Sequence, residues 1–410
     1  MKSKSKKSGE RKESTVGLVL VSILVALIAL LQNYKGQFTD VLQFYALHFW
    51  DGLHHWPYSE HTLLGTTETV HPVEYPALTG LIMWLISFAI DRPEPFSLGD
   101  AFEYYRITAA FHVALLVASA YLIKKLSAKK FAYYFVLAPA VLYSLNRNWD
   151  IWAIASMLLA ILWFEKKHYQ ISAVMLAISI AAKFFPIVLM LPITIIFLRN
   201  KQSLILFKYG STVAISWISI NLPFAIIDLK GWAYFYEFSF ERGLGTASFY
   251  QITQLIFSSI TFTSMHFYLL NVLALFVVLV YLLKLKLPLS LAESAFFVMF
   301  AFMLFNKQYS MQYIIWLTCL AVLTLSNISR KHREYLVYIY VLWQVVEFVF
   351  QYAFFQNLLT NSRTNTDLPM TIQISNTTYA YIGVARYLIA IIFALFLAKC
   401  LKSTKTRFPN

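Results

Sequence analysis

Charge is scarce in this 410-residue chain. Asp, Glu, Lys and Arg together make up 13% of the residues, whereas roughly 25% is usual in soluble domains. Acidic residues are the scarcer kind, with 20 Asp and Glu against 34 Lys and Arg, which gives a net charge of +14. A surface with so few charged groups excludes an ordinary soluble globular protein and indicates a chain that lies largely in lipid.

Cysteine is also rare, and its two positions, Cys319 and Cys400, lie in or beside apolar runs. Without a spacing pattern they predict neither a disulfide framework nor a zinc site. The chain has no Walker loop, no Rossmann glycine pattern and no catalytic serine elbow. These absences exclude a soluble nucleotide-binding domain and predict no cofactor, so an activated donor would arrive through the membrane.

What the chain has in abundance is apolar sequence: 59% of its residues are hydrophobic, and the mean hydropathy is +0.61. The predicted fold is an all-α, polytopic membrane bundle of about twelve spans. Val16 to Leu31 follows a basic tail, but no small-residue cleavage site follows it, so we expect a retained first span. The predicted spans are 16–31, 104–123, 131–146, 149–164, 169–182, 184–198, 204–226, 267–283, 290–305, 309–326, 335–355 and 381–399.

The distribution of cations predicts the topology. If the basic tail 1–15 is cytoplasmic, alternation places most Lys and Arg in cytoplasmic segments, including the second tail 401–410. The positive charge therefore needs no nucleic-acid partner. Residues 16–400 would form one membrane domain, with outer loops 32–103 and 227–266. A further apolar run, 77–90, would reverse this pattern if it crossed, so we expect it to dip into or lie along the outer leaflet; an ordinary short span that violates the charge rule is the alternative.

Some cations remain at the predicted outer face, against the charge bias. Lys183 and Lys307 occur at tight turns between apolar runs, where they either face a polar cavity that holds an anion or extend to the lipid headgroups. The outer cations are Lys35, Arg92, Arg106, Arg147, Lys183, Lys230, Arg242, Lys307, Arg363 and Arg386.

The long polar stretch from Gln32 to Tyr75 follows the first span and contains five of the nine histidines. Residues from Val41 to His48 have helical spacing of aromatic and apolar side chains, and Thr39 or Asp40 stands at the expected start. Asp40 is either a plain N-cap or a carboxylate that accepts a proton from a substrate hydroxyl. Metal binding is a further alternative, by residues whose spacing matches no specific pattern: His54, His55 and His61 with Asp51 or Glu60.

Later polar segments interrupt the apolar runs at the same predicted face. They are SLNRNWD at 144–150, AAKFFP at 181–186, FERGLGTASFYQ at 240–251 and NKQYSMQY at 306–313. Arg147 and Asp150 either pair with each other or serve a site. Glu347 and Arg386, inside two predicted spans, are expected to stabilise the bundle.

Taken in order, the Asp40 loop, VEYPALTGL at 73–81, NRNWD, AAKFFP, ERG at 241–243 and NKQYSMQYIIWL at 306–317 resemble the bacterial membrane glycosyltransferases of the GT-C superfamily. The likeness is in particular to the polyprenyl-phosphate-mannose-dependent mannosyltransferases, glycosyltransferase family 87, and extends over residues 15 to 400. Two departures are Ala77 in place of a second proline and Met311 in place of a proline.

The resemblance implies transfer of one sugar, usually mannose, from a polyprenyl phosphate to a lipid or glycan acceptor outside the cytoplasmic membrane, with inversion. It implies that Asp40 is the general base. Positive side chains would stabilise the leaving phosphate: Arg147, Lys183, Arg242 and Lys307. Others would position sugar or acceptor: Tyr75, Glu74, Asn148, Asp150 and Gln312.

Two other functions fit the composition. A transporter or flippase for lipid-linked sugars would also have about twelve spans, although such proteins typically contain internal repeats, which are not evident here. A non-catalytic membrane assembly partner with this fold is the third possibility.

Overall fold

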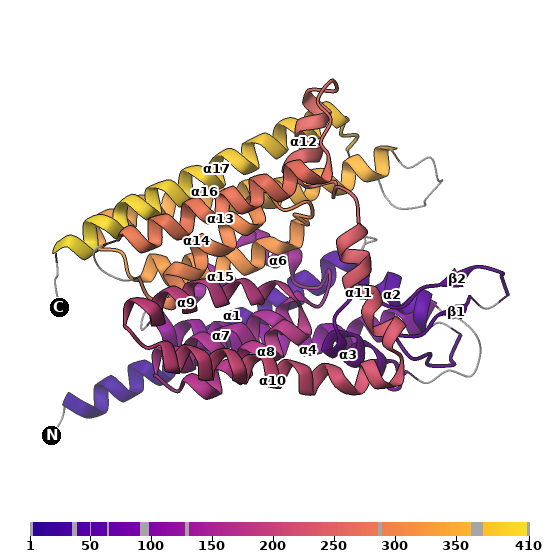
Figure 1. Cartoon of the computed structure of the whole chain (residues 1–410), viewed down its shortest axis with the longest axis horizontal. Helices are drawn as coiled ribbons and strands as arrows, with labels where there is room; N and C mark the ends of the chain where they lie inside the picture. Colours follow the sequence, from indigo (N-terminus) through magenta and orange to yellow (C-terminus); the bar gives the residue numbers. More distant parts are fainter. Residues whose placement is uncertain are drawn as a thin grey trace. The chain divides into compact units, whose positions relative to one another are not determined.

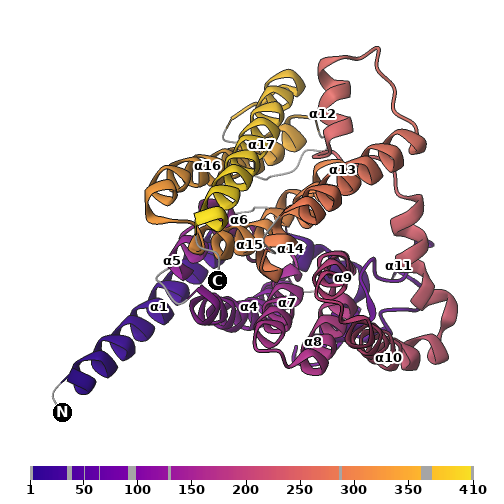
Figure 2. The ribbon, with the colours of Figure 1, turned by 60° about the vertical axis from the view of Figure 1, so that its left-hand side comes forward.

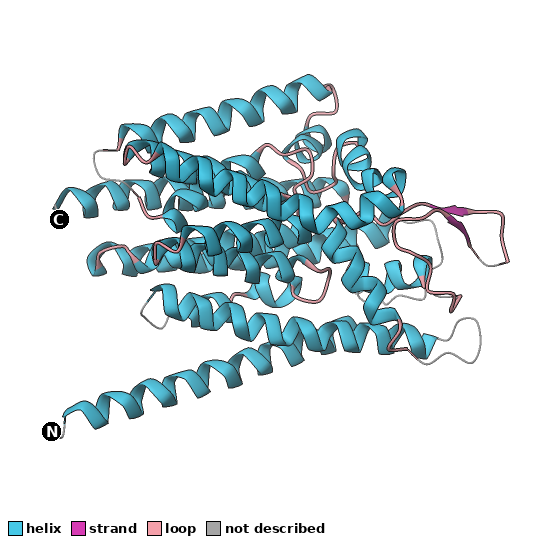
Figure 3. Cartoon of the chain, turned by 60° about the horizontal axis from the view of Figure 1, so that its bottom comes forward, coloured by secondary structure: helices cyan, strands magenta, loops and turns pink. Residues whose placement is uncertain are grey.

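The computed structural model describes residues 3–34, 39–49, 51–63, 65–90, 98–127, 131–285, 289–361 and 372–407. Within these ranges the chain is almost entirely helical, and a two-stranded hairpin is its only sheet (Figure 3). The predicted all-α class is thus confirmed. The chain forms two compact units, which are described separately: unit 1 comprises Met1–Gln37, Leu116–Leu145 and Leu244–Asn410, and unit 2 comprises Phe38–Leu115 and Asn146–Gly243.

Five of the described helices contain segments long and apolar enough to cross a membrane. These segments are Gly99–Ser127, Ser203–Ile227, Met265–Lys284, Arg330–Asn361 and Asn376–Lys402. Several of the other predicted spans form apolar helices that are shorter. Helix α3 (Ala77–Ser87) has 11 residues and is therefore about 16 Å long, roughly half of a hydrocarbon core. Whether residues 77–90 lie along the outer leaflet or form a short span stays a prediction.

Unit 2 is built around a group of apolar helices. Helix α8 packs against both α7 and α10 (Figures 1 and 2). Helix α3 packs on α8 and α10. The elements of this unit are α2 (Asp40–His48), β1 (His61–Thr62), β2 (Thr69–Val70), α3, α7 (Asp150–Glu165), α8 (Tyr169–Ala182), the 3-10 helix η1 (Phe185–Leu189), α9 (Met190–Arg199), α10 (Ser203–Ile227) and α11 (Leu229–Glu241). Helix α4 (Leu98–Ser127) begins in this unit and ends in unit 1.

The polar stretch that follows the first predicted span folds into α2 and the antiparallel hairpin, which pairs His61 with Val70. The α2 prediction is confirmed: Val41, Tyr45 and His48 are the buried residues of one helix face. The hairpin was not predicted, because its strands have two residues each, too few to show alternation.

Unit 1 contains the remaining helices. Helices α16 and α17 pack along each other, as do α14 and α15, and α6 packs against α15 and α16. The elements are α1 (Ser3–Tyr34), α5 (Ala132–Val136), α6 (Pro139–Ser144), α12 (Phe249–Ile256), α13 (Ser264–Lys284), α14 (Leu291–Leu304), the 3-10 helix η2 (Met311–Tyr313), α15 (Ile314–Ser326), α16 (Arg330–Asn361) and α17 (Asn376–Arg407).

The predicted span 131–146 is not one continuous helix, and whether it crosses the membrane stays a prediction. The segment breaks into α5 and α6 at Ala138, whose backbone is extended (φ −64°, ψ 121°). Pro139 explains the break, because proline has no N–H to donate and disfavours helical backbone in the residue before it. Pro186 has a similar position in the predicted span 184–198, which starts as a 3-10 helix and becomes α-helical only at Met190.

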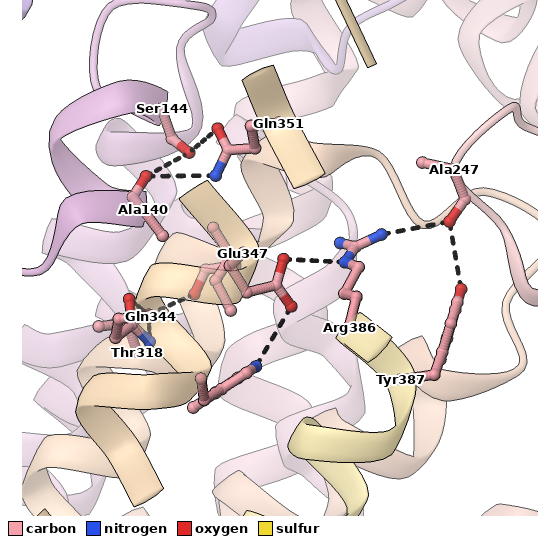
Figure 4. Close-up of polar contacts among 11 residues, drawn as sticks. Ala140, Ser144, Ala247, Thr318, Gln344, Glu347, Gln351, Arg386 and Tyr387 are labelled. Atoms are coloured by element: carbon pink, nitrogen blue, oxygen red, sulfur yellow. Dashed lines mark hydrogen bonds and ion pairs between the residues drawn. The ribbon is translucent and has the colours of Figure 1, made fainter. Parts of the chain in front are cut away.

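A buried ion pair joins the two longest helices of the carboxyl-terminal half (Figure 4). Nε of Arg386 on α17 donates to Oε2 of Glu347 on α16 at 2.8 Å, and the two side chains are 1% and 0% exposed. The indole of Trp343 donates to the other carboxylate oxygen at 3.2 Å. The Arg386 guanidinium also lies 3.9 Å from the centre of the Tyr309 ring. These contacts compensate both charges, so removal of either partner would leave the other charge buried without its partner. The stabilising role itself stays a prediction.

Other polar side chains of α16 find partners on neighbouring elements (Figure 4). Gln344 donates to Thr318 at 3.1 Å. Gln351 accepts from Ser144 at 3.0 Å and donates to the carbonyl of Ala140 at 3.4 Å. The Ala140 carbonyl belongs to the short helix α6, so Gln351 holds this interrupted segment against α16.

Candidate functional site

The candidate site in unit 2 begins at the first turn of α2. Thr39 has extended backbone (φ −139°, ψ 133°), and its hydroxyl oxygen accepts a hydrogen bond from the N–H of Val41 at 3.2 Å. Thr39 is therefore the N-cap, and the alternative that Asp40 is a plain N-cap is wrong. The carboxylate of Asp40 remains for contacts outside its own helix.

Asp40 is attached to two other segments of the chain. Its main-chain N–H donates to the carbonyl of Arg147 at 2.9 Å, and the hydroxyl of Tyr75 donates to its Oδ2 at 3.3 Å. Burial raises the pKa of Asp40 to about 6, and the negative charge of Asp150 acts in the same direction, while Lys183, the Tyr75 hydroxyl and Arg147 lower it. The carboxyl is thus mostly ionised at pH 7 and becomes protonated within about one pH unit below it.

Lys183 interacts with the three carboxylates of this region, Asp40, Glu74 and Asp150. It follows the last residue of α8 with extended backbone (φ −153°, ψ 127°). Its Nζ lies 2.8 Å from Oδ1 of Asp150 and 4.4 Å from the centre of the Tyr75 ring. Asp150, the first residue of α7, is 2% exposed, so its carboxylate is shielded from bulk water and depends on Lys183 for compensation of its charge. Asn148 closes the turn before α7, because its Oδ1 accepts from the N–H of Asp150 at 3.1 Å.

An aromatic group orients Tyr75. Its ring makes edge contacts with Phe44 and Trp149, at centroid distances of 5.4 and 5.3 Å, and these two rings also contact each other at 5.9 Å. Such edge-to-face packing restricts the ring, so the Tyr75 hydroxyl is directed at Asp40. Phe44 belongs to the helical spacing that predicted α2, but its contact with Tyr75 was not predicted. Trp149 was not singled out, because aromatic residues are common throughout the sequence.

Glu74 connects this group with Arg242. One carboxylate oxygen of Glu74 lies 4.0 Å from Nη1 of Arg242, and both side chains are partly exposed, at 38% and 44%. Burial raises the pKa of Glu74, whereas Arg242 and then Lys183 lower it. Arg242 terminates α11, so the end of that helix borders the group.

The two remaining predicted site residues, Lys307 and Gln312, belong to unit 1. The carbonyl of Lys307 accepts from the N–H of Gly245 at 2.8 Å, its ammonium lies 5.4 Å from the centre of the Phe267 ring, and Gln312 is in η2. Their participation with Asp40 in one site stays a prediction. Three predicted outer cations lie outside the described residues: Lys35, Arg92 and Arg363.

Histidines gather at the other end of α2. Nε2 of His55 lies 2.6 Å from Asp51, the rings of His55 and His61 stack at 4.0 Å, and His48 contacts His61 at 5.7 Å. Burial, followed by the neighbouring histidines, lowers the pKa of His48 to about 3, so this ring is neutral. Among the residues that the structure describes, no three or more His, Cys, Asp or Glu side chains are arranged to hold a metal ion.

Unit 2 therefore contains eight of the ten predicted site residues. They are Asp40, Glu74, Tyr75, Arg147, Asn148, Asp150, Lys183 and Arg242. Their arrangement offers a carboxylate able to accept a proton, a hydroxyl that orients it, and cations that can stabilise an anion.

Two residues connected to the start of α2 were not among the predicted site residues. Asn146 lies in the polar turn already noted, and its carbonyl accepts from the Thr39 hydroxyl at 2.9 Å. His112 is a polar residue inside the apolar run 104–123, which is the signal that could have indicated it.

Comparison of the chain with known protein families and with well-characterised proteins finds no match.

Proposed function

We propose that the protein is an inverting glycosyltransferase of a bacterial cytoplasmic membrane. It transfers a hexose, most readily mannose, from a polyprenyl-phosphate donor to a lipid or glycan acceptor at the outer face, within a GT-C-like fold of twelve spans whose termini are cytoplasmic. The observation that carries the proposal is the environment of Asp40. Thr39 caps the helix in its place, the Tyr75 hydroxyl donates a hydrogen bond to its carboxylate, and the positive charges of Lys183 and Arg147 lower its pKa.

Asp40 is the general base in this reaction. It accepts the proton of the acceptor hydroxyl while the hydroxyl oxygen forms a bond to the anomeric carbon. The bond between that carbon and the phosphate oxygen breaks, and the electron pair leaves with the polyprenyl phosphate, which needs no proton. A base with a pKa of about 6 suits this role, because it is mostly ionised at neutral pH and still binds a proton appreciably.

The leaving phosphate requires positive charge. Arg147 and Lys183 act on the same carboxylate environment, and Arg242 borders it through Glu74; Lys307 completes the proposed set. Removal of one such stabilising contact typically lowers the rate ~10²- to 10³-fold. The sugar and acceptor are positioned by Tyr75, Glu74, Asn148, Asp150 and Gln312.

The test compares Asp40→Asn with Asp51→Asn in membranes that contain equal amounts of protein. The probe is polyprenyl-phosphate mannose with a labelled sugar, and the acceptor is supplied by membranes of a strain that lacks the protein. We expect Asp40→Asn to lower transfer about 10²- to 10⁴-fold, which is typical for loss of a general base. Asp51→Asn should retain transfer, because Asp51 pairs with His55 at the other end of α2.

Wild-type transfer should decline as the pH falls through about 6, where Asp40 becomes protonated. Unchanged transfer by Asp40→Asn would remove Asp40 from the mechanism. A wild-type protein that transfers no sugar, but moves a fluorescent polyprenyl-phosphate lipid between leaflets of a vesicle, would replace the proposal with the flippase alternative.

A further inference from the structure

The position of Asp40 depends on a turn that is distant in sequence. The N–H of Asp40 donates to the carbonyl of Arg147 at 2.9 Å. The hydroxyl of Thr39 donates to the carbonyl of Asn146 at 2.9 Å and lies 3.2 Å from that of Arg147. Thr39 and Asp40, where α2 begins, are thus bonded to the main-chain carbonyls of Asn146 and Arg147. A displacement of the turn 146–147 therefore displaces Asp40.

The turn itself is held from α4. Nδ1 of His112 lies 3.2 Å from the side-chain oxygen of Asn146. An amide oxygen only accepts hydrogen bonds, so in this pairing the imidazole has its proton on Nδ1 and donates it. His112 is 0% exposed, Asn146 1% and Thr39 2%, which means that bulk water cannot substitute for any of these contacts.

From this geometry we propose that His112 is a positioning residue for the general base. Its imidazole fixes Asn146, the carbonyls of Asn146 and Arg147 fix the start of α2, and this start fixes the carboxylate of Asp40. The inference rests on the proposed function for the role of Asp40, but the anchoring of α2 by the turn is a property of the fold. His112 itself makes no contact with Asp40 among the described contacts and takes part in no proton transfer.

Anchoring of this kind matters because acid–base catalysis is sensitive to geometry: a misplacement of about 1 Å can cost ~10²-fold in rate. The Asp40 carboxylate also owes its raised pKa chiefly to burial. If the start of α2 loosens and water reaches the carboxylate, that pKa falls toward the ordinary value of an aspartate.

The experiment uses three substitutions at His112 in the full-length protein, reconstituted in lipid nanodiscs. His112→Asn keeps an N–H donor at the position of Nδ1, His112→Gln moves the donor outward to the position of Nε2, and His112→Leu removes it. Ser172→Ala is the matched control, because Ser172 is a fully buried side chain of unit 2 that bonds Tyr209 and the carbonyl of Ala160, away from α2.

The first measurement needs no substrate. Hydrogen exchange of the peptide that covers residues 39–49 reports the Asp40 N–H and the rest of α2. We expect exchange of this peptide to be about 10-fold faster in His112→Leu and faster in His112→Gln, but unchanged in His112→Asn and Ser172→Ala. Equal exchange in all four variants would overturn the proposal. If His112→Leu fails to fold, the difference between the Gln and Asn variants decides in the same way.

The second measurement is transfer of labelled mannose from polyprenyl-phosphate mannose. His112→Leu should lower kcat about 10- to 100-fold and change the KM for the donor less than about twofold, and the acidic limb of its pH profile should move below 6. His112→Asn should restore both kcat and the limb. A positioning role is contradicted if kcat falls without a change in hydrogen exchange of residues 39–49. It is also contradicted if the acidic limb of the pH profile does not move. Absence of transfer in the wild type refutes the proposed function. In that case hydrogen exchange alone tests whether His112 anchors the start of α2.

Discussion

Replacement of Asp40 by Asn should stabilise the protein at neutral pH. The pKa of Asp40 is about 6 in the folded chain, against an ordinary value of 3.8. Well below pH 3.8 the carboxyl is protonated in both the folded and the unfolded state, so its burial does not lower the free energy of unfolding. As the pH rises from there, the unfolded chain releases its proton first, so stability declines until the folded carboxyl also ionises above pH 6.

The size of the effect follows from the shift. About two pKa units at 1.36 kcal/mol each give about 3 kcal/mol at pH 7.5, and about half of that at pH 5, where the folded carboxyl is still mostly protonated. Asn avoids the cost because it carries no charge, and its side-chain oxygen can still accept from Tyr75. With an unfolding entropy of about 2 cal/mol/K per residue, 3 kcal/mol corresponds to an increase in Tm of about 3 to 4 °C.

The assay is thermal unfolding in one detergent at pH 7.5 and at pH 5, for the wild type, Asp40→Asn and Glu334→Gln. Glu334 is the control, since its side chain is 70% exposed and is hydrated in both states. We expect the Asp40→Asn advantage to shrink by about half at pH 5 and Glu334→Gln to change little. An Asp40→Asn protein that is less stable than the wild type at pH 7.5, or an advantage independent of pH, would refute the argument that burial governs this carboxyl.

Two further predictions concern the same unit. The pH below which sugar transfer declines should rise above 6 in Lys183→Met and fall below 6 in Asp150→Asn. The reason is that Lys183 lowers the pKa of Asp40 and Asp150 raises it. Shifts of this pH in the same direction for both variants would contradict the assignment. Gly231→Ala should destabilise the protein by more than about 2 kcal/mol, since a Cβ there would lie 1.5 Å from a main-chain carbonyl oxygen. Gly243→Ala, where a Cβ would have no neighbour within 4 Å, is its control, and equal unfolding temperatures for the two variants would count against the close approach.

Local sequence predicted much of the helical structure, and its failures have local causes. Helix α2 was expected from the spacing of Val41, Tyr45 and His48, because burial of one helix face leaves a 3.6-residue period. The interruption of the run 131–146 was not predicted, because hydropathy is averaged over a window, whereas a single proline at 139 interrupts the helical backbone. Hydropathy also does not distinguish a lipid-facing helix from a buried one, so the number of membrane crossings stays a prediction.

The candidate site was predicted as a set of residue types, but its connections were not. Asp40, Tyr75 and Lys183 come from different polar segments, and each segment was identified as an interruption of apolar sequence. That Lys183 pairs with Asp150, and that Thr39 takes the capping role, depends on which segments meet in space. His112 was missed for the same reason, since its partner Asn146 is 34 positions away in the chain.

Composition and periodicity by themselves determined that this chain is helical, that several of its helices are long and apolar enough to cross a membrane, and that its polar side chains gather in a few segments. The reason is that hydropathy and the burial of helix faces act on neighbouring residues. Tertiary structure alone decided that the carboxylate of Asp40 shares its surroundings with the Lys183–Asp150 pair and the hydroxyl of Tyr75. The physical reason is that Coulomb interactions and desolvation depend on distance in space, and distance in space between residues far apart in sequence is fixed only when the helices pack.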